Sequence, residues 1–356
     1  MYELINTSVP NGLIAGTHGF ATVAMTKGMP DAIRTRVENF CSYPHRTSAH
    51  DESYFHENPV NWFHLLILNR DHVVGKTAPV EFDHTGRTNR LAHTLVFGAK
   101  EMPIAGGAYV LSAESRRFVA GWSGEPKYLP VDKQTAGRLG LADIPKNTTP
   151  TNWTATFGED GAKYARRFAA LVAKNVSGGN KCVYFKTSTA WDGDGTRLLG
   201  LFADLINLLP EGIRPFVIFS TFAACVPNGV TCHLRGVYDK DRAFEIASAT
   251  QPWVDCEHGR IVHEELLPEE SEIAAAVAGR KVIEESMGRN PLGVTHGGNS
   301  GGNSGRRIVY GVPNRAHVSE KGFYVKLIIA FVLFVLVIVG GDLTYDYVKI
   351  NADYRS

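Results

Sequence analysis

The sequence predicts an α+β fold, with a mixed-sheet soluble region followed by a flexible linker and one C-terminal transmembrane helix. Three observations predict this class. Apolar residues make up 44% and charged residues 21% of the 356 residues, which is typical of a globular protein. Short apolar runs of strand length alternate with segments of helical periodicity. The run from Leu327 to Gly341 contains no charged residue, which is typical of a membrane span.

The first part of the chain predicts several strands and one helix. Pro30 and Asp31 stand where the first turn of a helix favours them, and therefore predict a helix over 31–40. Four apolar runs of strand length predict strands at 20–25, 63–68, 108–112 and 118–122.

After the polar run 145–150, which breaks the pattern, the order of elements predicts an α/β second half. Predicted strands lie at 181–186, 215–220 and 231–238, and predicted helices at 162–174, 198–209 and 271–287. A strand, helix, strand order at these lengths predicts a right-handed crossover that joins parallel strands.

The chain therefore divides into five predicted segments. They are an N-terminal α+β domain (1–148), an α/β second half (149–287), a Gly/Asn/Ser-rich linker (288–321), a transmembrane helix (322–342) and a short tail (343–356). The linker is too poor in apolar residues to bury a core. The span needs roughly 20 residues to cross the hydrocarbon layer.

Charges beside the apolar run predict its orientation. Basic residues precede the run, whereas acidic residues outnumber basic ones after it. The positive-inside rule then keeps the N-terminal domain in the cytoplasm, so we expect a single-pass protein of the inner membrane. The basic residues are Arg306, Arg307, Arg315 and Lys321, and the acidic residues are Asp342, Asp346 and Asp353.

Composition also disfavours several functions. With 37 Lys and Arg against 36 Asp and Glu, the net charge of +1 disfavours a dedicated nucleic-acid binder. Five scattered cysteines favour a reduced compartment over a disulfide framework. His45, His50 and His56 have no spacing typical of zinc sites, so no metal is expected. The sequence contains no dinucleotide or phosphate-loop fingerprint, and no cofactor is expected.

One polar string, from Asp83 to His93, holds the candidate catalytic residues. His93 could act as a general base, Asp83 could orient it, and Arg87 could hold an anion. The alternative is structural, because Asp, Asn and Thr beside Gly86 can satisfy their own backbone in a tight turn. The candidate binding residues are Asn58, Asn61, Asp83, Arg87, Asn89 and His93.

The first 110 residues also resemble a known family. Pro10-Asn-Gly-Leu, Asn58-Pro-Val-Asn61 and Asp83-His-Thr-Gly-Arg-Thr-Asn-Arg-Leu-Ala-His93 follow in the order of the N-terminal domain of the bacterial GTPase-associated protein one family. That family is encoded beside GTPases in predicted conflict (defence) systems. The resemblance implies a role in binding a partner near a GTPase, and it names no reaction.

Together these observations favour a membrane-anchored adaptor or sensor of a conflict system, which binds a GTPase or another system component. Expected contacts are this protein partner and membrane lipid through Leu327–Gly341, without nucleic acid, and self-association is left open. One alternative is a membrane-tethered hydrolase that uses His93, Asp83 and Arg87. Another is an effector that disrupts the membrane through its apolar helix. An enzyme is the less favoured class.

Overall fold

A computed structural model describes residues 1–44, 57–67, 71–141, 149–179, 181–227, 230, 232–238 and 241–272. The strands are β1 (Tyr2–Val9), β2 (Gly19–Thr26), β3 (Asn61–Ile67), β4 (Asp71–Val80), β5 (Asn89–Phe97), β6 (Lys127–Leu129), β7 (Val183–Lys186), β8 (Phe219–Ser220), β9 (Leu234–Val237), β10 (Trp253–Asp255) and β11 (Arg260–Val262). The helices are α1 (Asp31–Phe40), α3 (Gly107–Ala113), α4 (Thr135–Leu141), α5 (Thr151–Phe157), α6 (Gly161–Lys174), α7 (Thr189–Asp192), α8 (Thr196–Leu208) and α9 (Arg242–Ala247).

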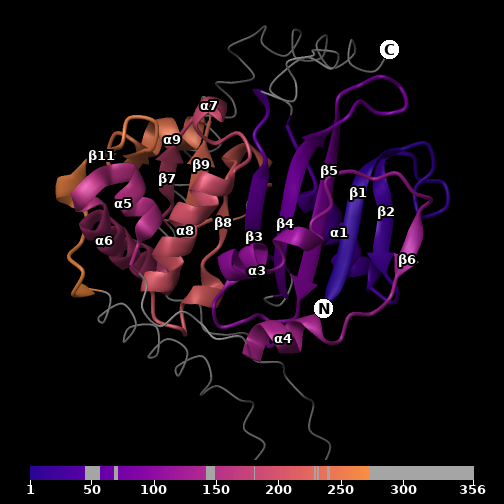
Figure 1. Cartoon of the computed structure of the whole chain (residues 1–356), viewed down its shortest axis with the longest axis horizontal. Helices are drawn as coiled ribbons and strands as arrows, with labels where there is room; N and C mark the ends of the chain where they lie inside the picture. Colours follow the sequence, from indigo (N-terminus) through magenta and orange to yellow (C-terminus); the bar gives the residue numbers. More distant parts are fainter. Residues whose placement is uncertain are drawn as a thin grey trace, which may run out of the picture. The chain divides into compact units, whose positions relative to one another are not determined.

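All eleven strands form one mixed sheet, in the order β11-β10-β7-β9-β8-β3-β4-β5-β1-β2-β6 (Figure 1). Strands β3, β4, β5, β1 and β2 pair antiparallel, whereas β10, β7, β9 and β8 pair parallel. The two parts meet where β8 pairs antiparallel with β3. Strands from both predicted domains, 1–148 and 149–287, therefore continue one sheet, and the domain limits themselves stay predictions.

In the N-terminal part, α1 and α3 cover opposite faces of the sheet. Phe40 of α1 packs in one buried cluster with Phe63 and Leu65 of β3. Gly107 of α3 lies against His64, where an added Cβ would come within 2.5 Å of the His64 ring. Since neighbouring strand residues point to opposite faces, His64 faces α3 while Phe63 and Leu65 face α1.

Helices also lie on both faces of the second part. The rings of Trp153 (α5) and Phe202 (α8) contact Phe185 of β7, with centroids 6.0 and 4.9 Å apart. On the other face Phe244 of α9 contacts Tyr184, with centroids 5.6 Å apart. Aromatic side chains of the helices therefore pack against both faces of the parallel strands.

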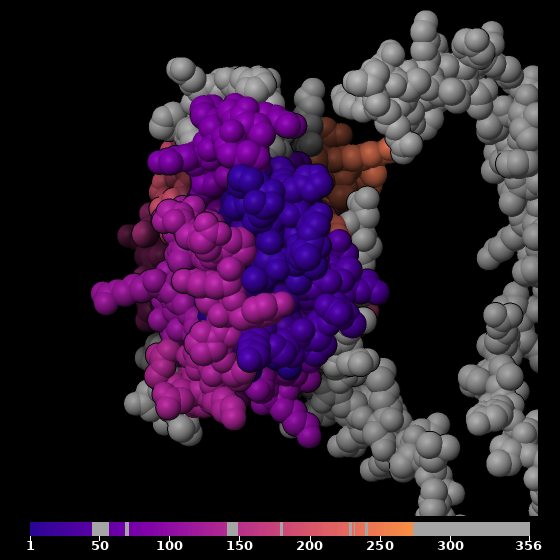
Figure 2. Space-filling view, turned by 90° about the vertical axis from the view of Figure 1, so that its right-hand side faces the viewer, coloured from indigo at the N-terminus to yellow at the C-terminus, as the bar shows by residue number. Residues whose placement is uncertain are grey.

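The edge beyond β1 belongs entirely to the N-terminal part. Strand β6 pairs parallel with β2, with Met25 opposite Tyr128. Figure 2 shows the result, in which magenta residues around β6 lie directly against the indigo N-terminal strands. The segment from 98 to 135 thus returns across the molecule to close this edge of the sheet.

The structure confirms the α+β class with a mixed sheet, the helix over 31–40 and the parallel crossover of the second part. Two predicted strands are wrong. Residues 108–112 lie in helix α3, and 118–122 form no strand. Most of the predicted helix 271–287 lies outside the described residues.

No helix in the described ranges is long and apolar enough to cross a membrane. The predicted linker 288–321, transmembrane helix 322–342 and tail 343–356 lie outside those ranges.

Candidate functional site

The candidate motif forms the turn between β4 and β5. Asp83 Oδ1 accepts hydrogen bonds from the backbone N–H of Thr85 and Arg87, at 2.8 and 3.1 Å, and from the Thr85 hydroxyl at 2.6 Å. Its Oδ2 accepts from the Ser8 hydroxyl at 2.9 Å. Partial burial would raise the pKa of Asp83, but these hydrogen bonds hold it well below its ordinary value. The carboxylate is therefore ionised and closes its own turn.

Arg87 and Asn89 have different surroundings, although they belong to the same string. Arg87 is exposed, and its Nε donates to the Thr85 hydroxyl at 3.1 Å. Asn89 is buried, and its Oδ1 accepts from the backbone N–H of Ser8 at 3.2 Å and of Arg90 at 2.7 Å. The Asn89 side chain therefore connects the end of β1 with the start of β5 through hydrogen bonds.

A cavity of about 630 Å³ lies beside this turn. Its walls include Asp83 and Asn89, together with Phe82 and Trp122, but neither Arg87 nor His93. The Trp122 indole N–H is buried and has no hydrogen-bond partner among the residues that the structure describes. Of the predicted residues, the structure thus brings Asp83 and Asn89 to one cavity. Arg87, the proposed anion-binding residue, and His93, the proposed base, do not line it.

His93 lies in the middle of β5 and is buried by the segment around Val119. The Val119 N–H donates to His93 Nδ1 at 3.2 Å, so Nε2 carries the proton and donates to Glu3 Oε1 at 2.9 Å. Both ring nitrogens are therefore engaged, and neither hydrogen-bonds to Asp83. This arrangement suits a structural histidine better than a general base.

Glu3 connects His93 to a network of charges that sequence reasoning did not identify. Its Oε2 accepts from Arg117 Nε at 2.9 Å, and Arg117 Nη1 donates to Asp132 Oδ2 at 2.8 Å. Burial alone would raise the pKa of Glu3, but His93 and Arg117 lower it below its ordinary value. Asp132 Oδ1 also accepts from the N–H of Thr135, at the start of α4, at 2.9 Å. The network joins β1, β5 and α4.

The two predicted asparagines lie elsewhere, at the start of β3. Asn61 is buried, and its Oδ1 accepts from the Ser220 hydroxyl at 2.8 Å and the Phe222 N–H at 3.0 Å. Asn58 is buried as well. Asn61 therefore connects β3 with β8, where the antiparallel and parallel parts of the sheet meet.

The predicted residues thus occupy three places. These are the β4–β5 turn, the Glu3 network that includes His93, and the junction of β3 with β8. Asp83 and Arg87 hydrogen-bond within the turn, whereas the side chains of Asn61, Asn89 and His93 hydrogen-bond to neighbouring strands. No proton-transfer pair joins Asp83 to His93. Within the described ranges, no three histidine, cysteine, aspartate or glutamate side chains are placed to hold a metal ion. A catalytic role for these residues stays a prediction.

Replacing Asp83 with alanine is expected to lower the free energy of unfolding by about 1–2 kcal/mol, because the turn loses charge-assisted hydrogen bonds. His84→Ala is the matched control, because His84 is exposed in the same turn. We expect it to change stability by less than about 0.5 kcal/mol. Urea unfolding followed by tryptophan fluorescence measures both. An unchanged stability of the Asp83 variant would contradict the structural role.

Comparison with known proteins identifies the N-terminal part. Residues 1–135 match the family model of GTPase-associated protein 1, N-terminal domain type 2. This range contains β1 to β6, the β4–β5 turn and every residue named above in the Glu3 network. No curated protein and no solved structure matches the chain significantly.

Proposed function

From the match of residues 1–135 to this domain, we propose that the protein is a membrane-anchored adaptor or sensor, which binds a GTPase of a bacterial conflict system at the inner membrane. The match is the main observation that supports the proposal, because it associates this part of the chain with a GTPase system. It names no reaction.

The contacts of the candidate residues support binding over catalysis. A general base needs a free nitrogen or oxygen within reach of the proton that it removes. His93 has none, since Glu3 and Val119 engage both ring nitrogens. Asp83 is held ionised by its own turn. An adaptor needs only a rigid surface, and these hydrogen bonds keep the β4–β5 turn and its neighbours rigid.

The sequence supports the membrane part of the proposal. Leu327 to Gly341 is uncharged, and basic residues precede it while acidic residues follow it. One membrane span would hold the folded N-terminal part close to the bilayer and raise the local concentration of any partner there. This effect is sufficient for a recruiting function, and it requires no chemistry by the anchored chain.

The test is to co-express the full chain with a candidate GTPase of such a conflict system. One sample is separated into membranes and supernatant, and another is solubilised in detergent to purify the complex. A second chain carries Val335→Asp and Val337→Asp, and its matched control carries Val335→Leu and Val337→Leu. We expect the full chain and the leucine control to sediment with membranes and retain the GTPase. The aspartate chain should bind the GTPase equally well but stay in the supernatant.

Each part of the proposal can fail separately. If no complex retains the GTPase, the adaptor function is wrong whatever the membrane result. If the aspartate chain still sediments with membranes, the apolar run is not the anchor. Light scattering of the purified complex gives its stoichiometry, and therefore shows whether the chain self-associates.

A further inference from the structure

A cavity of about 470 Å³ lies in the second part of the chain, beside the end of α6. Its walls come from the end of α6, the start of β7, residues 250–252 before β10 and residues 266–272. Figure 1 shows the last of these segments, in orange, beside α6. Arg167 of α6 connects the two, since its Nη2 donates to the Leu267 carbonyl at 2.7 Å. The cavity is within the size range of small-molecule sites.

The larger part of the cavity wall is apolar. The apolar lining residues are Leu171, Pro252, Leu266, Leu267 and Pro268. Leu266 is 50% exposed, so a ligand that covered it would remove carbon surface from water. Cys182 adds no charge to the wall, because burial raises the pKa of its thiol well above the ordinary value.

One buried polar side chain of the lining has no partner among the described residues. Asn175 directly follows α6 and is only 4% exposed, and its Nδ2 makes no hydrogen bond there. A buried donor without an acceptor costs about 1–3 kcal/mol. The terminal amide of asparagine turns readily about its last side-chain bond. An oxygen of a ligand in the cavity would therefore supply the missing acceptor.

The charged lining residues leave one positive charge uncompensated. They are Lys174, Lys181 and Glu272. Lys174 Nζ lies 3.7 Å from Glu272 Oε2, so these two charges offset each other. Lys181 is exposed and pairs with no acidic residue that the structure describes. Only the short connection from α6 to β7 separates Lys181 from Asn175, so both belong to the same side of the cavity.

The neighbouring acidic residues do not cancel this charge. Glu269 and Glu270 precede Glu272 in the chain, but they pair with Arg167 and Arg166 of α6 at 3.8 and 3.9 Å. The cavity therefore has an apolar wall on one side, and an unpaired lysine with an unpartnered amide on another.

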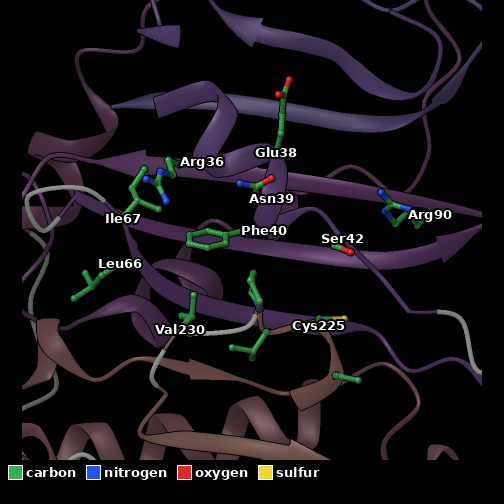
Figure 3. Close-up of a pocket in the computed structure, with 13 residues that line it drawn as sticks. Arg36, Glu38, Asn39, Phe40, Ser42, Leu66, Ile67, Arg90, Cys225 and Val230 are labelled. Atoms are coloured by element: carbon green, nitrogen blue, oxygen red, sulfur yellow. The ribbon is translucent and has the colours of Figure 1, made fainter. Parts of the chain in front are cut away.

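The larger cavity around Phe40, of about 640 Å³, lacks this arrangement. Figure 3 shows Arg36 and Arg90 on opposite sides of the Phe40 ring. They cannot both contact one small anionic group, so the cavity beside α6 is the better candidate for a small ligand.

We propose that the cavity beside α6 binds a small organic carboxylate, with its charged group near Lys181 and Asn175 and its apolar body against Leu266. A neutral apolar ligand would leave the lysine charge and the amide unused. An inorganic anion would leave the apolar wall uncovered. Compact metabolic acids and fatty acids share this chemistry. The site is independent of the proposed GTPase partner and of the proposed membrane anchor.

The test measures binding of 4-phenylbutyrate to the full chain in nonionic micelles by equilibrium dialysis, and protein-free micelles give the detergent background. We expect a dissociation constant on the order of 100 μM. Lys181→Gln should raise this constant about fivefold, because an exposed ion pair is lost. The uncharged isostere 4-phenylbutyramide should bind about fivefold more weakly and respond little to this variant. Lys186→Gln is the matched control, since Lys186 is exposed at the end of β7 and does not line the cavity.

A second pair of variants tests the apolar wall. Leu266→Ala should weaken binding of both probes to a similar extent, about threefold, because it removes carbon surface that either ligand would cover. Ile246→Ala is the control, because Ile246 is 68% exposed outside the cavity. Unchanged melting temperatures of all four variants exclude loss of folding as the cause.

Competition identifies the ligand class. Acetate, which has no apolar body, should need at least tenfold higher concentrations than 4-phenylbutyrate. Stronger competition by decanoate would support a fatty acid as the source, and weaker competition would support a compact acid. Equal binding of the carboxylate and its amide, or equal weakening by the two lysine variants, would overturn the proposal. No binding at millimolar probe would overturn it as well.

Discussion

Replacing Arg117 with methionine is expected to lower the free energy of unfolding by about 3 kcal/mol. Arg117 is the cation between Glu3 and Asp132, and its side chain is 23% exposed while that of Glu3 is 14% exposed. Methionine retains much of the side-chain volume but leaves these carboxylates without their cation. Breaking a buried pair by removing one partner costs more than the intact pair contributes, because the remaining charge is desolvated.

Arg116→Met provides the control, since Arg116 is the exposed neighbour of Arg117 in the short 3-10 helix Ser115–Arg117. We expect it to change stability by less than about 0.5 kcal/mol. Urea unfolding in mild detergent, followed by tryptophan fluorescence, compares the two. A loss below about 1 kcal/mol in the Arg117 variant would show that the network contributes little. Adding Glu3→Gln to the Arg117→Met variant tests whether the lost stability arises from the uncompensated Glu3 carboxylate.

Lowering the pH from 7 to 5 is expected to destabilise the fold by about 4 kcal/mol through two buried histidines. His64 Nδ1 donates to the Val217 carbonyl at 2.8 Å, and His64 Nε2 accepts from His72 Nδ1 at 2.9 Å. Burial, together with the charge of His72, lowers the pKa of His64 from 6.5 to about 3. Burial alone lowers the pKa of His72 to about 4.

The direction of this effect follows from proton binding. In the unfolded chain each histidine takes up a proton near pH 6.5, whereas in the folded chain both stay neutral to about pH 4. Unfolding therefore binds protons between these values, and stability falls as the pH decreases through this window. For each histidine that stays neutral in the folded chain, the free energy of unfolding falls by about 1.4 kcal/mol per pH unit below pH 6.5. At pH 5 this decrease is about 2 kcal/mol per residue.

Urea unfolding at pH 7, 6 and 5 measures the slope. His72→Leu should remove about half of the pH dependence, because one of the two titrating rings is gone. His84→Gln is the control, since His84 is exposed and should leave the slope unchanged. If the slope of the His72 variant equals that of the parent chain, other groups cause the acid sensitivity.

Helix and strand signals in the sequence predicted the elements whose local pattern was unambiguous. Pro30 and Asp31 predicted the start of α1, and the helix runs from Asp31 to Phe40 as expected. Residues 108–112 show the limit of such signals. This apolar run predicted a strand, but it forms α3, with Ala108, Val110 and Leu111 buried. A run of this length suits either element, so packing decides between them.

Two glycines at the start of α3, Gly106 and Gly107, explain why packing favours a helix there. Gly106 has a φ of 84° and lies so close to the Arg214 carbonyl that a Cβ would come within 2.7 Å of its oxygen. Gly107 makes the equivalent approach to His64. Both contacts involve residues distant in the sequence, so local propensity alone could not predict them.

In the candidate site, too, contacts between nearby residues could be predicted from the sequence, whereas contacts between distant residues could not. The polar string from Asp83 to His93 predicted either a catalytic group or a self-satisfied turn, and its residues left the two alternatives open. The hydrogen bonds of Asp83 within 83–87 are local, because Thr85 and Arg87 are two and four residues away. The partner of His93 could not be inferred in this way, since Glu3 is 90 residues away.

By itself, the sequence determined the mixed α/β composition, the helix α1, the parallel crossover and the family resemblance confirmed over residues 1–135. These features depend on interactions within a few residues or on a fixed order of motifs. Only the tertiary structure decided which polar groups meet. Glu3 meets His93 and Arg117, and Asn61 meets Ser220 and Phe222. Such contacts depend on strand order and register, which bring together residues that no local pattern relates.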